Sequence, residues 1–173
     1  MSRSSWITTG VILLLACTPV HADPGIGETE PALVASELDG STFNLAAERG
    51  HVVLVDVWAT WCGPCRAEMP ILNAFYLKFH PQGVELLGLS ADSARDADTV
   101  RQVMKQFSYP AALLVSAEQN GFGRPRVVPM TYVFDREGVL RAELWPGGTP
   151  VTEQNLEEAV QPLLVGGSNA ERH

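Results

Sequence analysis

Two cysteines separated by two residues, Cys62 and Cys65, are the residues of this sequence best suited to chemistry. A structural disulfide normally closes a longer loop, because its benefit grows with the number of residues enclosed. A tetrahedral metal site needs about four ligands, and beyond the pair the chain from residue 23 onward offers only His51, His80 and His173, with no second ligand pair. The spacing therefore favours a redox couple that alternates between dithiol and disulfide.

The positions of the two cysteines predict different roles. Cys62 lies where a helix should begin, and there the unsatisfied backbone N–H groups and the positive end of the helix dipole favour a thiolate. Cys65 lies one turn further in and should be sheltered. We therefore expect Cys62 to be the exposed nucleophile that attacks a substrate disulfide, and Cys65 to be the resolving thiol that releases the reduced substrate.

The resolving step requires a proton acceptor near Cys65. Asp56 is the only acid in the apolar run from Val52 to Trp58, and burial should raise its pKa toward neutrality. We expect Asp56 to exchange protons with the thiols, so that their titrations are coupled. The alternative is that Asp56 only hydrogen-bonds to neighbouring backbone. Glu68 could serve as a second acid, although an exposed helical carboxylate is the simpler interpretation.

Hydrophobic periodicity predicts the elements that position these residues. The run over 52–58 predicts a central strand buried on both faces, and the spacing over 64–79 predicts a helix with Pro64 in its first turn and a kink at Pro70. The other predicted elements are a hairpin over 32–45, strands over 84–90 and 111–115, a helix over 96–107, a loop over 120–126, a second hairpin over 130–145 and a last helix around 156–163 capped by Thr152. This order implies an α/β fold, with a mixed sheet and helices on both faces.

Residues 1–22 have the layout of a secretory signal peptide. Arg3 precedes an apolar run over 7–16, and small residues precede Asp23. Because the run is shorter than the roughly 20 residues of a membrane-spanning helix, we expect a cleaved signal and a periplasmic protein. Cleavage before Cys17 is an alternative, since a small residue followed by cysteine resembles a lipoprotein processing site. Lipid on Cys17 would then tether the domain to a membrane.

Length and composition predict a single domain in the rest of the chain. We expect residues 23–31, which are rich in Pro, Gly and acids, to be a flexible lead-in, 32–165 to form the domain and 166–173 to be a disordered tail. The formal net charge of −8 argues against a nucleic-acid partner, because nucleic acids bind to basic patches. Partners should be proteins or small thiols.

The segment WATWCGPCRAEMP (58–70), preceded by VVLVDV (52–57) and followed much later by VVPMTYVFD (127–135), resembles the thioredoxin superfamily. It is most similar to the secreted branch of TlpA-like and ResA-like thiol:disulfide oxidoreductases, over about residues 30–165. The resemblance implies a thioredoxin fold in which the region from about 90 to 110 forms the central insertion of TlpA-like proteins. It implies no cofactor other than the redox-active Cys62/Cys65 disulfide, and no metal.

The resemblance also implies which residues contact the substrate. Asp56 falls at the family's buried acid, and Pro129 falls at a cis-proline beside the active site; the alternative is an ordinary trans-proline that enters an edge strand. Val128 would be held extended and would offer its backbone to a substrate strand. Met130 stands where this branch commonly has Thr, which could alter partner preference. The other expected contact residues are Trp61, Gly63 and Pro64.

The direction of the reaction depends on the potential of the dithiol. The Gly63-Pro64 pair, identical to that of thioredoxin, favours a reductase, whereas a more oxidising potential would make the protein a disulfide donor. Because the periplasm is kept oxidising, a reductase there must be recharged, and the resemblance implies a membrane electron donor of the DsbD or CcdA kind. It implies substrates such as the haem-binding cysteines of apocytochrome c or the cysteines of copper-site proteins.

Two other classes fit these residues less well. A peroxiredoxin shares the fold but requires Thr three residues before its reactive cysteine, where Ala59 stands. A copper-binding chaperone requires a third ligand, usually a distant His, and a wider cysteine spacing. Peroxide turnover or copper binding by the isolated protein would favour one of these classes over a disulfide reductase.

Overall fold

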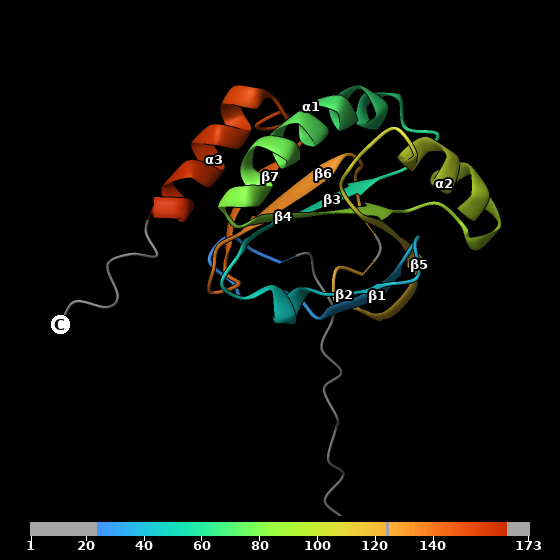
Figure 1. The fold of residues 1–173 in the computed structure, drawn as a ribbon, viewed down its shortest axis with the longest axis horizontal. Helices are drawn as coiled ribbons and strands as arrows, with labels where there is room; N and C mark the ends of the chain where they lie inside the picture. The colour runs from blue at the N-terminus through green and yellow to red at the C-terminus, as the bar shows by residue number, and fades with distance from the viewer. Residues whose placement is uncertain (1–23, 124, 166–173) are drawn as a thin grey trace, which may run out of the picture.

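A computed structural model describes residues 24–123 and 125–165 of the chain (Figure 1). The predicted signal peptide, Cys17 and the predicted tail lie outside the described residues. The strands are β1 (Leu33–Glu37), β2 (Thr42–Asn44), β3 (Val52–Trp58), β4 (Val84–Ser90), β5 (Ala111–Asn120), β6 (Met130–Phe134) and β7 (Leu140–Leu144). The helices are α1 (Gly63–Phe79), α2 (Ala97–Met104) and α3 (Glu153–Val165), with short 3-10 turns η1 (Leu45–Glu48), η2 (His80–Gln82) and η3 (Ala94–Asp96).

The seven strands form one mixed sheet in the order β2-β1-β5-β4-β3-β6-β7. β3 pairs in parallel with β4 and antiparallel with β6, so it has a neighbour on each side. All seven of its residues are buried, which confirms the predicted central strand. The predicted hairpins are confirmed as the antiparallel pairs β1/β2 and β6/β7.

The α-helices cover one face of the sheet, and the expectation of helices on both faces is wrong. The buried side chains of α1, α2 and α3 all belong to one core cluster on that face. The second core cluster is instead closed by residues of β1, β2 and η1, namely Leu33, Ala35, Phe43 and Leu45. In Figure 1, β1 and β2, which are the far end of the same sheet, lie as a layer below β3 and β4. Because this layer buries the apolar side chains of the second face, no helix is required there.

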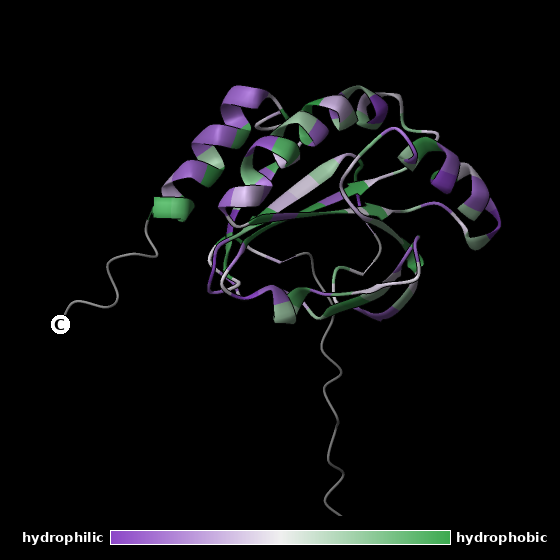
Figure 2. Ribbon diagram, in the orientation of Figure 1, coloured by the Kyte–Doolittle hydropathy of each residue, from purple (hydrophilic) through white to green (hydrophobic). Residues whose placement is uncertain are grey.

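The helices are amphipathic in the way that burial on one side demands. Figure 2 shows hydrophilic and hydrophobic segments alternating along each of them. α3 begins as expected: the N–H of Asn155 donates to Thr152 Oγ1 at 3.1 Å. α2 lies in the region expected to be the central insertion but ends at Met104, three residues earlier than predicted. Phe107 follows the helix and still packs against the core cluster beneath α1.

β5 is twice as long as the predicted strand over 111–115. Its first residues pair in parallel with β4, and its later residues pair antiparallel with β1, as in the pair formed by Ala35 and Ala117. The segment over 116–120 is largely polar and carries no strand periodicity. Its extended conformation depends on β1, which contributes the hydrogen-bonding partner.

Residues 24–31, predicted to be a flexible lead-in, instead lie along the start of β7. The N–H of Gly27 donates to Leu140 O at 2.8 Å, the N–H of Leu140 donates to Glu28 O at 2.8 Å, and the N–H of Glu30 donates to Gly138 O at 2.7 Å. β7 is an edge strand, and such an edge presents unpaired backbone groups. The expectation of a flexible segment is wrong because the composition of residues 24–31 does not reveal that their backbone can pair with this edge.

Candidate active site

Cys62 and Cys65 form a disulfide at the N-terminus of α1. Cys62 is the N-cap residue, and its Sγ accepts a hydrogen bond from the N–H of Cys65 at 3.2 Å. Gly63 and Pro64 occupy the first two helical positions, where the missing N–H of proline removes no helical hydrogen bond. The predicted position of the cysteine pair at a helix start is therefore confirmed.

The disulfide lies just beneath the surface. Cys62 is 6% exposed and Cys65 is 1% exposed, so Cys62 is the more accessible cysteine, as expected, but it is not the broadly exposed residue that the sequence suggested. Its Sγ is turned toward the first turn of α1 by the disulfide and by the N-cap hydrogen bond. The residues next to Cys62 in the chain are exposed: Trp61 is 71% exposed, and Gly63 and Pro64 are exposed as well.

Asp56 lies on β3 beneath α1. Alternate residues of a strand face the same side, and Leu54 and Trp58 belong to the core cluster that contains both cysteines. Asp56 is 2% exposed and accepts a hydrogen bond from Thr131 Oγ1 at 2.9 Å. Burial raises the pKa of Asp56 to about 7, with a smaller lowering by the Thr131 hydroxyl. The expected burial and raised pKa are confirmed, and the hydrogen-bond partner is a side chain rather than backbone.

Glu68 is the acid that the sequence interpretation misjudged. It is half-buried rather than exposed, and its Oε2 atom is buried without a hydrogen-bond partner among the described residues. Burial raises the pKa of Glu68 to about 7, and its negative charge further raises the pKa of Asp56. Glu68 lies three residues after Cys65, and residues at this spacing share one helix face. This spacing was the signal that could have identified it.

The peptide bond between Val128 and Pro129 is cis, as expected. Pro129 is buried and Val128 is half-buried, and Val128 packs against the core cluster that contains both cysteines. Val128 and Trp61 also line the same surface cavity, which has a volume of about 530 Å³. Met130 starts β6 opposite Val57. The structure thus brings the segment around Pro129 and the surface beside Cys62 together.

Two further features can be stated for residues 24–123 and 125–165. No cluster of three or more His, Cys, Asp or Glu side chains is arranged to hold a metal ion there. Over the same residues, every helix is too short or too polar to cross a lipid bilayer.

Comparison with known proteins agrees with this geometry. The AhpC/TSA family profile matches residues 26–143. The chain is 32% identical over 151 residues to the thiol-disulfide oxidoreductase ResA of Bacillus cereus (strain ZK / E33L), covering 80% of this chain and 86% of the relative. It is 30% identical over 176 residues to ResA of Bacillus thuringiensis subsp. konkukian, covering 94% of this chain and 99% of the relative.

Solved structures share the fold at lower sequence identity. A thiol:disulfide interchange protein of the thioredoxin family from Chlorobium tepidum has a TM-score of 0.67 and 22% identity, covering 81% of this chain and 98% of that one. A secreted thiol-disulfide isomerase from Corynebacterium glutamicum has a TM-score of 0.62 and 24% identity, covering 78% of this chain and 84% of that one. The family match, the ResA relatives and the fold together show that the chain belongs to the AhpC/TSA family within the thioredoxin superfamily, as a ResA-like thiol-disulfide oxidoreductase.

Proposed function

We propose that the protein is an exported reductase that uses Cys62 and Cys65 to reduce disulfides in other exported proteins. The observation that carries the proposal is the position of the disulfide at the start of α1, above a buried acid with a pKa of about 7. The helix N-terminus stabilises a thiolate at Cys62. The acid can take up or release a proton near neutral pH.

In the first step, the Cys62 thiolate attacks one sulfur of the substrate disulfide. A mixed disulfide forms between Cys62 and the substrate, the substrate S–S bond breaks, and the other substrate sulfur leaves as a thiolate that takes a proton from solvent. Cys65 stays reduced during this step because it is the more buried of the two cysteines, 1% exposed.

In the second step, Cys65 attacks Sγ of Cys62, the mixed disulfide breaks, and the second substrate sulfur leaves as a thiolate that takes a proton from solvent. Cys65 must first lose its proton, and Asp56 accepts it, because a carboxylate with a pKa of about 7 is a competent base in an apolar site. The product is the Cys62–Cys65 disulfide, and two electrons have passed to the substrate. Glu68 shares the same buried region and shifts the pH at which Asp56 is available.

The substrate would bind across the surface beside Cys62. Trp61, Gly63 and Pro64 supply its exposed part. The backbone of Val128, before the buried Pro129, would pair with an extended substrate segment. Met130 would contribute a flexible apolar side chain that favours apolar residues near the substrate cysteine.

We further propose that the protein is periplasmic after cleavage of residues 1–22 and is recharged by a membrane electron donor of the DsbD or CcdA kind. In an oxidising compartment, no soluble thiol pool reduces the Cys62–Cys65 disulfide back to the dithiol, so the electrons must come from another donor. Apocytochrome c and copper-site proteins are the proposed substrates. Mass spectrometry of the protein isolated from its host tests the export step, since cleavage after Ala22, lipid on Cys17 and an intact leader give different masses.

The mechanism is tested with cysteine variants in an insulin-disulfide reduction assay. Cys62→Ser should abolish reduction, whereas Cys65→Ser should form a stable mixed disulfide with substrate that appears as a higher-mass adduct. Both variants remove one sulfur from the same helix turn, so each is the control for the other. Unchanged reduction by Cys62→Ser would rule out the proposed nucleophile.

The direction is tested by the reduction potential of the Cys62/Cys65 pair in glutathione or dithiothreitol redox buffers. A value near that of thioredoxin, roughly −270 mV, supports a reductase, and a value near that of DsbA, roughly −120 mV, supports a disulfide donor instead. Peroxide turnover or copper binding measured on the same sample would favour the peroxidase or the copper chaperone.

A further inference from the structure

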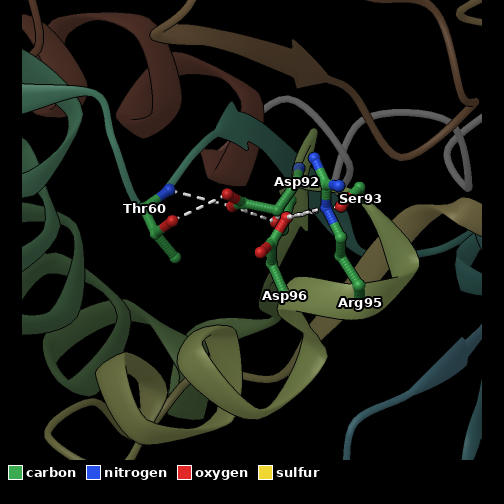
Figure 3. Close-up of polar contacts among 6 residues, drawn as sticks. Thr60, Asp92, Ser93, Arg95 and Asp96 are labelled. Atoms are coloured by element: carbon green, nitrogen blue, oxygen red, sulfur yellow. Dashed lines mark hydrogen bonds and ion pairs between the residues drawn. The ribbon is translucent and has the colours of Figure 1, made fainter.

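The loop that leads to Cys62 lies beside the loop that follows β4. β3 and β4 are parallel neighbours, so their carboxyl ends, and the loops that leave them, lie at the same edge of the sheet. The N–H of Ala91 donates to Trp58 O at 2.8 Å, which ties the two loops where they begin. Figure 3 shows the side chains that continue this connection.

Asp92 joins the two loops through both of its carboxylate oxygens. Oδ2 accepts hydrogen bonds from the N–H of Thr60 at 2.8 Å and from Ser90 Oγ at 2.7 Å, and Oδ1 accepts one from Thr60 Oγ1 at 2.7 Å. The N–H of Asp92 in turn donates to Ser90 Oγ at 3.1 Å. Asp92 is 3% exposed and Ser90 is 0% exposed, whereas Thr60 is half-buried, so the carboxylate side of this contact is buried.

The other polar contacts in Figure 3 differ from this one. Ser93 Oγ donates to Asp96, and Arg95 pairs with Asp96 at 3.9 Å, both within the loop itself. The side chains of Arg95 and Asp96 are 88% and 44% exposed. Ion pairs between exposed side chains of this kind contribute little to the stability of the folded protein. Asp92 is therefore the acid of this loop that is buried and bonded to the segment before the cysteines.

We propose that Asp92 is a positioning residue for the redox couple. Thr60 lies two residues before Cys62, and the N–H of Cys62 donates to Ala59 O at 3.1 Å. By fixing both the backbone and the hydroxyl of Thr60, Asp92 fixes the turn that places Cys62 as the N-cap of α1. The N-cap position is what exposes the Cys62 sulfur to the stabilising N–H groups of the helix. The inference rests on the proposed function, in which Cys62 is the nucleophile.

The test compares Asp92→Ala with Asp92→Asn in the full protein. The amide of Asn can still accept from the Thr60 N–H and can donate to the Thr60 hydroxyl, so it keeps the connection without the charge. Asp92→Ala removes both. Asp98→Ala, at a side chain that is 97% exposed, is the control for loss of one negative charge from the same region.

Two readouts report on positioning: the pH dependence of Cys62 alkylation by iodoacetamide in the reduced protein, and kcat and KM for insulin reduction. For Asp92→Ala we expect kcat/KM to fall about tenfold, as loss of a few hydrogen bonds would produce, with the alkylation midpoint moved to higher pH. Asp92→Asn should restore most of both values. Equal effects of Ala and Asn would show a charge effect and overturn the inference. A lower melting temperature with unchanged alkylation and kinetics would also overturn it.

A second pair of variants, at Thr60, keeps the test decisive if Asp92→Ala fails to fold. Thr60→Val removes only the hydroxyl that donates to Asp92 Oδ1, and Thr60→Ser restores it. We expect slower alkylation and slower reduction for Val than for Ser, and equal values would overturn the inference. Alkylation requires no protein substrate. If the wild-type protein failed to reduce insulin, the proposed function would be wrong, while the alkylation profiles would still decide the role of Asp92.

Discussion

Replacing Asp56 with asparagine removes a buried titrating group and leaves the side-chain volume nearly unchanged. Asp56 is 2% exposed, and desolvation is the largest cause that raises its pKa from 3.8 to about 7 in the folded protein. The Asn carbonyl oxygen can still accept the hydrogen bond that Thr131 Oγ1 donates to Asp56. The substitution therefore tests the energetic consequence of the buried charge alone.

The raised pKa determines the sign of the effect. Because the folded protein binds this proton more tightly than the unfolded chain, the contribution of protonated Asp56 to stability is fully present below about pH 4 and is lost as the pH rises through about 7. A difference of about three pH units corresponds to about 4 kcal/mol. We expect Asp56→Asn and the wild-type protein to be about equally stable at pH 4, and the variant to be more stable by up to about 4 kcal/mol at pH 8.5.

The assay is urea unfolding of the oxidised proteins at several pH values between 4 and 8.5. The disulfide prevents the cysteines from titrating, so they add no pH dependence of their own. Asp98→Asn is the matched control, because it makes the same substitution at a side chain that is 97% exposed. A stability difference between wild type and Asp56→Asn that is constant across this range would refute the argument.

Two further predictions concern the surroundings of Asp56. Glu68→Gln removes a negative charge that raises the pKa of Asp56, so the Asp56 titration, followed by carbon-13 NMR of its carboxyl group in the oxidised protein, should move to lower pH; a midpoint that stays in place or rises would contradict this. Gly88→Ala adds a methyl group 3.1 Å from Tyr109 Cε2 and 3.2 Å from Trp58 Nε1. This crowding should lower the free energy of unfolding by about 1–3 kcal/mol, and an unchanged urea midpoint would show that the two rings move aside freely.

The local sequence was sufficient to predict the structure wherever the conformation of a segment depends on one helix or strand and on its own burial. The apolar run over 52–58, interrupted only by Asp56, correctly predicted a strand buried on both faces and a buried acid within it. Pro64 and the helical spacing that follows it placed the cysteine pair at a helix start. The hairpin over 130–145 and the cap at Thr152 were also correct, because turns and caps depend on few neighbouring residues.

Features that depend on a partner distant in the sequence were missed. The polar half of β5 is a strand because β1 pairs with it. The lead-in over 24–31 is ordered by backbone hydrogen bonds to the start of β7. The α-helices share one face because β1, β2 and η1 cover the other. In each case the local composition fits more than one conformation, and a contact made elsewhere in the chain selects one.

The sequence by itself determined the chemistry that is available: a cysteine pair at a helix N-terminus and an acid in the preceding strand. The tertiary structure decided how that chemistry is tuned. Glu68 influences Asp56 because α1 packs on the face of the sheet that carries Leu54 and Trp58. Asp92 holds Thr60 because two parallel strands end side by side, although 32 residues separate them in the chain. The physical reason is that desolvation and short hydrogen bonds depend on distances in space, which spacing along a chain does not specify.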